Sequence, residues 1–316
     1  MSTVGTASTA FDVSDSLLAR CSFPPPGTAV TCAVSGGADS MALLVLAVHA
    51  RCQVEAVHVD HGLRPGGDAE AAAVRRVATE LGAAFRAERV DVGAGPNLEA
   101  RARAARYAVL PPGVLTGHTA DDQAETVLIN VLRGAGLDGL AGIRASRPAG
   151  PSRPLLALRR SETRGLCAHM GIVAVDDPSN DDRSLLRNRI RHELLPLLST
   201  AANRDLVPVL ARQAALAADE ADLLDDLAAA LDPTDARALV DAPAPLARRA
   251  VRGWLRAVQG GGLPPDSASV ERVLAVARGD RLATEVAGGW RVRRSAQRLS
   301  LVPPPPEARP IGLRSE

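Results

Sequence analysis

The stretch that most constrains the fold runs from an apolar segment at residues 29–34, through a glycine-rich segment at 35–40, into a helical pattern at 41–50. This order is typical of a buried strand that turns sharply into a helix. Glycines let backbone N–H groups converge, serines add hydroxyl donors, and a helix N-terminus favours negative charge. The sequence therefore predicts an anion-binding loop made of Ser35, Gly36, Gly37, Ala38, Asp39 and Ser40.

The chain contains no lysine, so all 37 of its basic residues are arginine. A Walker A phosphate loop needs a lysine before its Ser or Thr, and that class of loop is therefore excluded. Asp39 stands in the loop instead. A phosphate loop that carries aspartate suggests a different nucleotide chemistry.

With 316 residues and 46% hydrophobic content, the chain can bury one large core or two moderate ones, and we expect two domains. No run approaches the roughly 20 apolar residues of a membrane span, and no signal peptide pattern opens the chain. We therefore expect a cytoplasmic protein without a membrane partner. The four cysteines lack Cys-x-x-Cys spacing, so we expect them to be small core residues.

Short apolar runs alternate with helical segments from residue 28 onward, which predicts an α/β domain with an open parallel sheet and helices on both faces. The expected strands are 29–34, 53–59, 84–90, 114–117 and 172–175. Asp68 is expected to cap a helix at 69–81, and Thr119 with Asp122 resembles a capping box.

The expected organisation has four parts: a loose lead-in (1–27), a catalytic domain (28–203), a long connecting helix (204–232) and a small C-terminal domain (233–316). The last part is expected to end in a β-hairpin around Gly288 and Gly289. Charge is divided along this end of the chain, because residues 205–235 carry a net charge of −7 and residues 236–316 a net charge of +7. A basic terminal domain is a candidate for contact with a nucleic acid. A GC-rich genome that uses arginine in place of lysine would also produce arginine-rich surfaces.

Two further motifs carry candidate ligand-binding groups. Asp60 and His61 follow the second expected strand. Taken alone, an Asp at the end of a strand is as often a helix cap or a ribose ligand as a group with another role in the site. The alanine-rich helix at 97–107 places Glu99, Arg103 and Arg106 on one face, beside Tyr107. These arginines either bind phosphates or form ordinary surface pairs.

The strongest cluster after the loop is Thr116 to Thr126, where a strand ends and a helix begins. Asp121, Asp122 and Glu125 lie within one helical turn of each other, and like charges this close repel unless a cation lies between them. Either Mg²⁺ with nucleotide phosphates or the ammonium group of a substrate would satisfy them. Further on, Asp177-Pro178-Ser179-Asn180 precedes a helix on which Arg187 and Arg191 share a face.

Taken in order, the motifs resemble those of the tRNA(Ile)-lysidine synthetases, a family of PP-loop ATP pyrophosphatases. They read Ser-Gly-Gly-Ala-Asp-Ser, Asp-His-Gly-Leu-Arg, Glu-Ala-Arg-Ala-Arg-Ala-Ala-Arg-Tyr, Gly-His-Thr-Ala-Asp-Asp-Gln-Ala-Glu-Thr, Arg-Pro-Leu-Leu, and Asp-Pro-Ser-Asn with Arg-Asn-Arg-Ile-Arg. The first motif alone specifies only the superfamily, and the full series over residues 28–200 is far more specific. Beyond residue 204 the match is weak.

The resemblance implies an ATP- and Mg²⁺-dependent ligase that acts on an isoleucine tRNA with a CAU anticodon and on free L-lysine. ATP adenylates the wobble cytidine at its C2 oxygen and releases pyrophosphate; the lysine ε-amine then displaces AMP. A homodimer is one option for its oligomeric state.

The same resemblance implies roles for individual residues. The catalytic group is Asp39, His118, Asp122 and Arg187. ATP is bound by residues 35–40 together with Asp60, His61, Arg103 and Arg106, and lysine by Asp122 and Glu125. Mg²⁺ is held by Asp39 and Asp121, and Arg191 joins the arginines that bind the adenylate or tRNA phosphates.

Three other functions stay open from the sequence. A sulfur-inserting PP-loop enzyme needs a reactive cysteine or an iron–sulfur site, which the cysteine pattern disfavours. An amide-forming ligase of the GMP, NAD or asparagine synthetase kind lacks its glutaminase domain here. A non-enzymatic ATP sensor or RNA-binding protein is disfavoured by the intact Asp121, Asp122 and Glu125 cluster.

Overall fold

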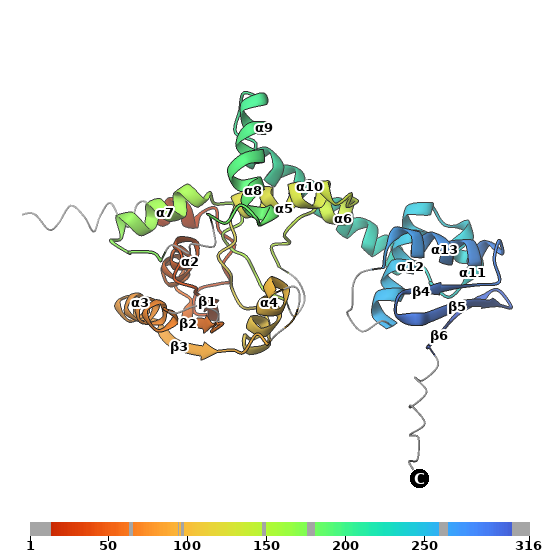
Figure 1. The fold of residues 1–316 in the computed structure, drawn as a ribbon, viewed down its shortest axis with the longest axis horizontal. Coiled ribbons are helices and arrows are strands. Elements are labelled where there is room, and N and C mark those ends of the chain that lie inside the picture. The colour runs from red at the N-terminus through yellow and green to blue at the C-terminus, as the bar shows by residue number, and fades with distance from the viewer. Residues whose placement is uncertain are drawn as a thin grey trace, which may run out of the picture. The chain divides into compact units, whose positions relative to one another are not determined.

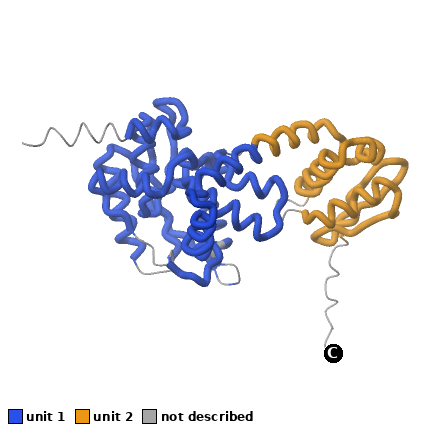
Figure 2. Tube along the Cα trace, turned by 90° about the horizontal axis from the view of Figure 1, so that it is seen from above, with its two compact units in different colours: residues 1–218 blue, residues 219–316 orange. Residues whose placement is uncertain are grey.

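The chain is described here by a computed structural model that covers residues 14–62, 66–93, 95, 98–146, 150–175, 181–258 and 265–304. Two compact units make up the chain, residues 1–218 and 219–316 (Figure 2). The division falls inside one helix, α10 (Val207–Ala229), which lies within the segment expected to be a connecting helix. Each unit has its own hydrophobic core.

The sheet of the first unit contains three parallel strands, β1 (Ala29–Ala33), β2 (Gln53–Asp60) and β3 (Ala84–Arg89), in that spatial order (Figure 1). Their bounds match the first three expected strands to within a residue. The expected strand at 114–117 contributes only a bridge, in which Leu115 pairs with Cys32 on one side and Ser152 on the other.

The strand expected at 172–175 is wrong. In the described part of this segment the backbone N–H of Val175 donates to the carbonyl of Gly36 at 3.0 Å, so the segment meets the glycine-rich loop and not a neighbouring strand.

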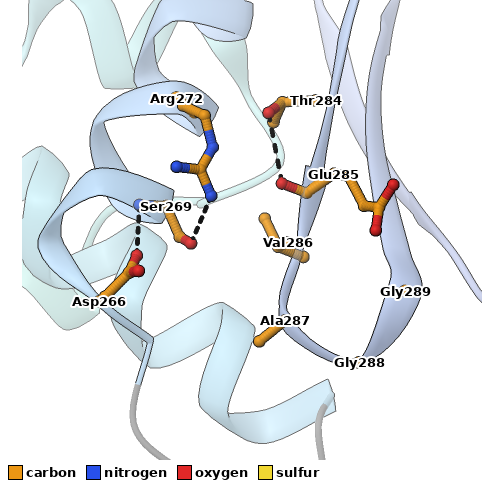
Figure 3. A pocket seen from close by; sticks show the side chains of 9 residues that line it. All are labelled: Asp266, Ser269, Arg272, Thr284, Glu285, Val286, Ala287, Gly288 and Gly289. Carbon is orange, nitrogen blue, oxygen red and sulfur yellow. Dashed lines mark hydrogen bonds between the residues drawn. The ribbon is translucent and has the colours of Figure 1, made fainter.

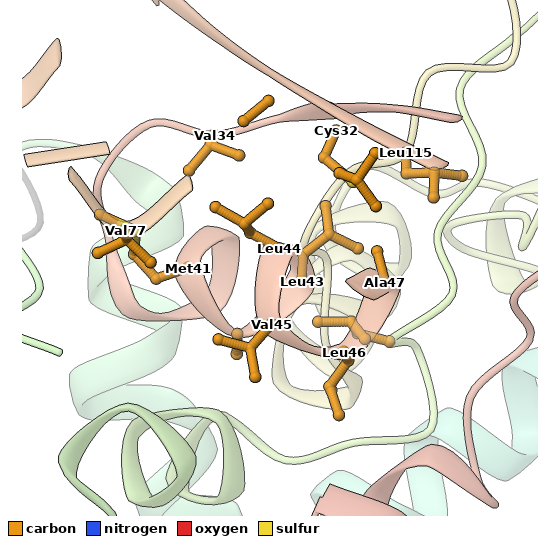
Figure 4. Packing of buried hydrophobic residues seen from close by; sticks show 14 of the residues in the cluster. Cys32, Val34, Met41, Leu43, Leu44, Val45, Leu46, Ala47, Val77 and Leu115 are labelled. Atoms are coloured by element: carbon orange, nitrogen blue, oxygen red, sulfur yellow. The ribbon is translucent and has the colours of Figure 1, made fainter. Parts of the chain in front are cut away.

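Helices cover both faces of this sheet, as the alternation of side chains along the strands requires. Cys32 faces a core built with α2 (Ala38–His49), α3 (Gly67–Glu80) and α7 (Arg160–His169), while Ala33 faces the side covered by α4 (Leu98–Val109). Figure 4 shows the α2 side chains packed against Cys32, Val34 and Leu115. The α/β class with an open parallel sheet and helices on both faces is therefore confirmed.

Helix α2 is buried along almost its whole length, because residues 40–47 are all shielded from solvent. A helix that is apolar on every side belongs in a core. Its N-terminus is consequently held rigidly at the end of β1, which fixes the position of the loop between them.

The two predicted helix starts differ in outcome. Asp68 does not cap α3: the helix begins at Gly67, and the cap position is taken by Gly66, whose φ of 115° suits a glycine. Helix α5 (Ala120–Leu132) begins as predicted with a capping box, since the Asp122 carboxylate accepts a hydrogen bond from the Thr119 N–H at 2.9 Å.

The rest of the first unit packs around α5. Ala120 and Ala124 of this helix contact Leu195 and Val207 in a small separate core. The elements involved include α6 (Leu137–Leu140), α8 (Leu186–Arg189), a π-helical turn (Ile190–Leu194) and α9 (Leu195–Ala201). The π-helical turn interrupts the regular helix that the sequence predicted through Arg187 and Arg191.

In the described part of the second unit, three helices that follow α10 pack on an antiparallel sheet. The helices are α11 (Ala236–Asp241), α12 (Ala244–Val258) and α13 (Ser267–Arg278), and the strands are β4 (Ala283–Val286), β5 (Trp290–Ser295) and β6 (Arg298–Val302). Strands β4 and β5 form a hairpin across Gly288 and Gly289, as expected. An open hollow of about 570 Å³ lies between the start of α13 and β4 (Figure 3).

None of the helices in the described ranges is both long enough and apolar enough to span a membrane.

Candidate functional site

A cavity of about 520 Å³ opens where β1, β2 and the bridge segment at Leu115 end. Ligands bind at this edge of open parallel sheets because loops and helix N-termini converge there. The lining comes from six parts of the chain: residues 33–35 and 37–40; 57–59, 61 and 70; 106 and 107; 116–118 and 122; 160 and 164; and 175 and 191.

The glycine-rich loop forms one wall of the cavity. Gly36 has a φ of 94°, and Gly37 precedes α2 without a side-chain cap on the helix N-terminus. The hydroxyl of Ser40 accepts a hydrogen bond from the Ser35 N–H at 3.1 Å and donates to the Gly37 carbonyl at 2.8 Å. This serine therefore braces the loop from inside, and the anion-binding capacity rests on the backbone and the helix dipole.

Gly117 was not singled out by the sequence, yet it presses against the loop. A Cβ atom placed on Gly117 would lie 2.6 Å from the carbonyl oxygen of Asp39 and 3.0 Å from the backbone nitrogen of Ser40. Only a glycine permits the end of this segment to approach the first turn of α2 so closely. The signal for it in the sequence was its place after an apolar run.

Asp39 projects from the first turn of α2 toward α7. Its carboxylate accepts hydrogen bonds from the hydroxyl of Thr163 and from Nε of Arg160, the latter at 3.4 Å. Burial raises the pKa of Asp39 above its usual value, and the Thr163 hydrogen bond opposes that shift. Thr163 and Arg160 were not identified from the sequence, because they lie far from Asp39 along the chain.

Asp122 and Glu125 lie at the centre of a cluster with three arginines. Glu125, whose side chain is only 1% exposed, bonds Arg160 at 3.0 Å, Arg187 at 2.8 Å and Arg191 at 2.7 Å. Asp122 bonds Arg160 at 2.9 Å and Arg187 at 3.1 Å. Burial opposes ionisation of Asp122, yet Arg160 and Arg187 keep its pKa below the usual range. The cation that these carboxylates require is supplied by the chain itself.

Asp121 does not line the cavity. It bonds the Arg159 guanidinium at 3.1 Å and 3.2 Å and the backbone N–H of Arg160 at 2.8 Å. Burial opposes its ionisation, while the bonds from Arg159 and Arg160 lower its pKa. These contacts tie the start of α5 to the start of α7.

Three buried polar atoms of residues that line the cavity have no hydrogen-bond partner among the described residues. They are Nε2 of His58, Nδ1 of His61 and the hydroxyl of Tyr107. Buried polar atoms are nearly always paired in proteins, so each of the three is available to a ligand. Arg106 lies over the Tyr107 ring at 5.4 Å, and Arg103 lies at 5.0 Å.

His118 also lines the cavity. Its Nδ1 is 2.9 Å from the hydroxyl of Thr116, and burial lowers its pKa to about 4 despite the nearby Asp122. The imidazole is therefore neutral at physiological pH and accepts or donates a hydrogen bond without carrying charge.

Other predicted residues lie elsewhere. The carboxylate of Asp60 does not line the cavity; it accepts the N–H of Gly62 at 2.8 Å and lies 3.7 Å from Nε of Arg89. Arg103 is exposed on α4. Residues 177–180 and Arg64 fall outside the described residues, as does the side chain of Glu99.

Comparisons with known proteins identify the family of this chain. Residues 14–198 match the PP-loop domain, and residues 235–300 match the TilS substrate binding domain. The chain is 45% identical over 245 residues to the tRNA(Ile)-lysidine synthase of Nocardia farcinica, covering 73% of this chain and 77% of that one. The corresponding enzyme of Rhodococcus erythropolis is 42% identical over 250 residues, covering 75% and 76%.

The chain belongs to the tRNA(Ile)-lysidine synthase family. Among solved structures, a U34-tRNA thiolase of Methanococcus maripaludis superposes with a TM-score of 0.50 over 68% of this chain and 79% of that one. The two sequences are 16% identical, so this likeness concerns the fold alone. For a tRNA(Ile)-lysidine synthase family member, the cavity at the sheet edge is the candidate active site.

Proposed function

We propose that this enzyme uses ATP to attach free lysine to the wobble cytidine of an isoleucine tRNA with a CAU anticodon. The C2 oxygen of the cytidine attacks the α-phosphate of ATP and pyrophosphate leaves; the lysine ε-amine then attacks C2 and AMP leaves. The observation that carries the proposal is that one cavity joins a helix N-terminus, a carboxylate–arginine cluster and buried polar atoms without partners among the described residues. Membership of the tRNA(Ile)-lysidine synthase family supports it.

The cavity offers groups suited to the different parts of ATP. The loop at 35–40 and the N-terminus of α2 suit the phosphates, because converging N–H groups and a helix dipole stabilise negative charge. The unpaired polar atoms of His58, His61 and Tyr107 suit the polar edges of a nucleoside. Without such a ligand these buried atoms have no hydrogen-bond partner among the described residues, which is costly. Arg106 also lines the cavity and adds positive charge on that side.

Mg²⁺ bound to ATP usually keeps several waters and takes one or two carboxylates from the protein. Asp39 fits that role, since it lines the cavity beside the loop and its side chain is 25% exposed. Asp121 fits less well, since its carboxylate does not line the cavity and is paired with the Arg159 guanidinium. When bound, the ion would neutralise charge that develops on the phosphates during adenylation.

The proposed partners of the lysine ammonium are the carboxylates of Asp122 and Glu125, once an arginine that bonds them in this structure has moved. Asp122 lines the cavity and shares Arg187 with Glu125. His118 lines the same cavity as Asp122. Because it is neutral, its ring can hydrogen-bond the reacting base without repelling the incoming amine.

The tRNA would also contact the second unit. On its sheet, Arg291 and Arg293 of β5 lie on the exposed face, together with Ser295 and, across the register, Ser300 of β6. Guanidinium and hydroxyl groups are the usual donors to phosphate oxygens. The opposite face of this sheet contributes Val286, Val292 and Leu299 to the core.

The cysteines support a ligase over a sulfur-inserting enzyme. No cysteine is among the described residues that line the cavity, and burial raises the pKa of both Cys21 and Cys32 to about 12. Thiols of this kind are poor nucleophiles.

We further propose that the enzyme works in the cytoplasm, where ATP, lysine and tRNA are present together, and we retain a homodimer as one option.

The test is incubation of the full chain with an unmodified CAU isoleucine tRNA, ATP, Mg²⁺ and radiolabelled lysine. We expect label in the tRNA, at the wobble cytidine, with one AMP released per lysine attached. A methionine tRNA with the same anticodon and a reaction without ATP serve as controls. Absence of label in a correctly folded transcript would overturn the substrate assignment.

A further inference from the structure

The two carboxylates proposed to bind lysine have no oxygen left unbonded. Oε1 of Glu125 accepts from Arg160 and Arg191, and Oε2 accepts from Arg187 and Arg191. Oδ1 of Asp122 accepts from Arg160 and Arg187, while Oδ2 accepts from the N–H and hydroxyl of Thr119. A lysine ammonium therefore binds here only if an arginine leaves.

The charge of the cluster leads to the same conclusion. Three carboxylates, from Asp39, Asp122 and Glu125, face three guanidinium groups, from Arg160, Arg187 and Arg191. The formal charges balance. An added ammonium would leave an uncompensated positive charge in a largely buried place, which is unfavourable unless a guanidinium moves to a different anion.

Arg187 is the most exposed of the three arginines, and, unlike Arg160 and Arg191, it does not line the cavity, so binding a phosphate there requires its side chain to move. Its side chain is 36% exposed, compared with 15% for Arg160 and 21% for Arg191. Arg160 is also held by Asp39, and its backbone N–H bonds Asp121. Departure of Arg187 would release one hydrogen-bonding position on Asp122 and one on Glu125, which together suit a single ammonium.

We propose that Arg187 is a positioning residue that makes lysine binding dependent on the nucleotide. A phosphate in the cavity draws the Arg187 guanidinium away from Asp122 and Glu125, and the lysine ammonium takes its place. Guanidinium groups bind phosphate oxygens bidentately, so the exchange replaces one strong pair with another. This inference rests on the proposed function, because it assumes that lysine binds these two carboxylates.

The consequence is reciprocal. If a nucleotide raises the affinity for lysine, lysine raises the affinity for the nucleotide by the same factor. The enzyme would then hold lysine tightly only when ATP or the adenylated tRNA is present.

The experiment measures binding of radiolabelled lysine to the full chain by equilibrium dialysis, with and without saturating α,β-methylene-ATP and Mg²⁺. We expect the analogue to lower the Kd for lysine by roughly 5- to 150-fold, the ordinary range of coupling between sites. In the Arg187→Gln variant, lysine should bind tightly without the analogue, and the analogue should add little. Arg183→Gln is the matched control, since Arg183 pairs with the exposed Glu193 outside the cluster; it should keep the coupling.

Arg187→Lys keeps the positive charge and serves if Arg187→Gln fails to fold. Its own ammonium should compete for the two carboxylates, so lysine should bind more weakly than to the unmodified chain even with the analogue present. Equal lysine affinity with and without the analogue, in a chain that does form lysidine, would overturn the inference alone. Failure to form lysidine at all would instead overturn the proposed function.

Discussion

Gly117 and Asp39 are in such close contact that a methyl group on Gly117 would lie 2.6 Å from the Asp39 carbonyl oxygen. The Gly117→Ala substitution should therefore push the first turn of α2 outward. We expect ATP affinity to fall by about tenfold and stability by about 1–3 kcal/mol, as for other overpacked sites. Isothermal titration with ATP and urea unfolding measure the two effects.

Gly165→Ala is the control for this variant. Gly165 lies inside α7, and a Cβ there would meet nothing within 4 Å. Alanine favours helix over glycine, so stability should rise by roughly 0.5–1 kcal/mol without a change in ATP affinity. If both variants bind ATP equally well, the contact between Gly117 and the loop has no functional role.

The Tyr107→Phe substitution should change ligand affinity and stability in opposite directions. The Tyr107 hydroxyl is buried and has no partner among the described residues, so its removal should stabilise the ligand-free chain by about 1 kcal/mol. The same change should weaken ATP binding several-fold if the hydroxyl bonds the nucleoside. A loss of stability, or unchanged ATP affinity, would contradict this assignment.

Removal of the Glu125 carboxylate should destabilise the first unit strongly. Glu125→Ala leaves three guanidinium groups around an apolar side chain, and breaking a buried ion pair typically costs about 3–5 kcal/mol. For comparison, Glu193→Ala removes an exposed partner of Arg183 and should cost at most about 1 kcal/mol. Chemical denaturation of both variants tests the difference, and equal costs would show that the cluster is not structural.

His118 predicts a particular pH dependence of stability. Its pKa is lowered by burial from 6.5 to about 4, so the unfolded chain binds more protons than the folded chain between these values. The contribution of His118 to stability is therefore fully present above pH 6.5 and is lost as the pH falls toward 4. Urea unfolding at several pH values gives the free energy of unfolding as a function of pH. Between pH 4 and 6.5 this free energy should change less steeply with pH for His118→Asn than for the unmodified chain. Equal pH dependence in the two chains would refute the assignment.

The exposed face of the second sheet can be tested through salt. Substitution of both Arg291 and Arg293 by Gln should weaken tRNA binding, because fewer phosphates are neutralised. The slope of log K against log salt should become shallower by about 0.7–0.9 for each phosphate that the protein no longer neutralises. Arg248→Gln is the control, because Arg248 is paired with Glu271. An unchanged slope in the double variant would assign tRNA binding to a different surface.

The parts that sequence predicted well are local. The order strand, glycine-rich loop and buried helix at 29–50 depends on neighbouring residues, as does the capping box of Thr119 and Asp122. Asp60 shows the limit of this approach: its place after β2 was predicted, but its carboxylate bonds the adjacent turn at Gly62. A motif specifies the position of a side chain more firmly than the partner that it bonds.

The parts that could not be predicted depend on contacts between distant segments. Arg160 and Asp39 lie 121 positions apart, yet the guanidinium of Arg160 joins the carboxylates of α2 and α5. No local pattern marks such an arginine, since it is simply the first residue of helix α7. The sequence indicated that the clustered carboxylates need a cation, and only the fold shows that arginines of the chain supply it.

The π-helical turn at Ile190–Leu194 makes chain length a constraint on the site. A π-helical turn contains one residue more than an α-helical turn. With this extra residue, Arg191 bonds Glu125 of α5 while Leu195 packs against Ala120 and Ala124, also of α5. Deletion of a single residue here would rotate everything that follows by about 100°. In evolution this segment should therefore accept substitutions more readily than insertions or deletions.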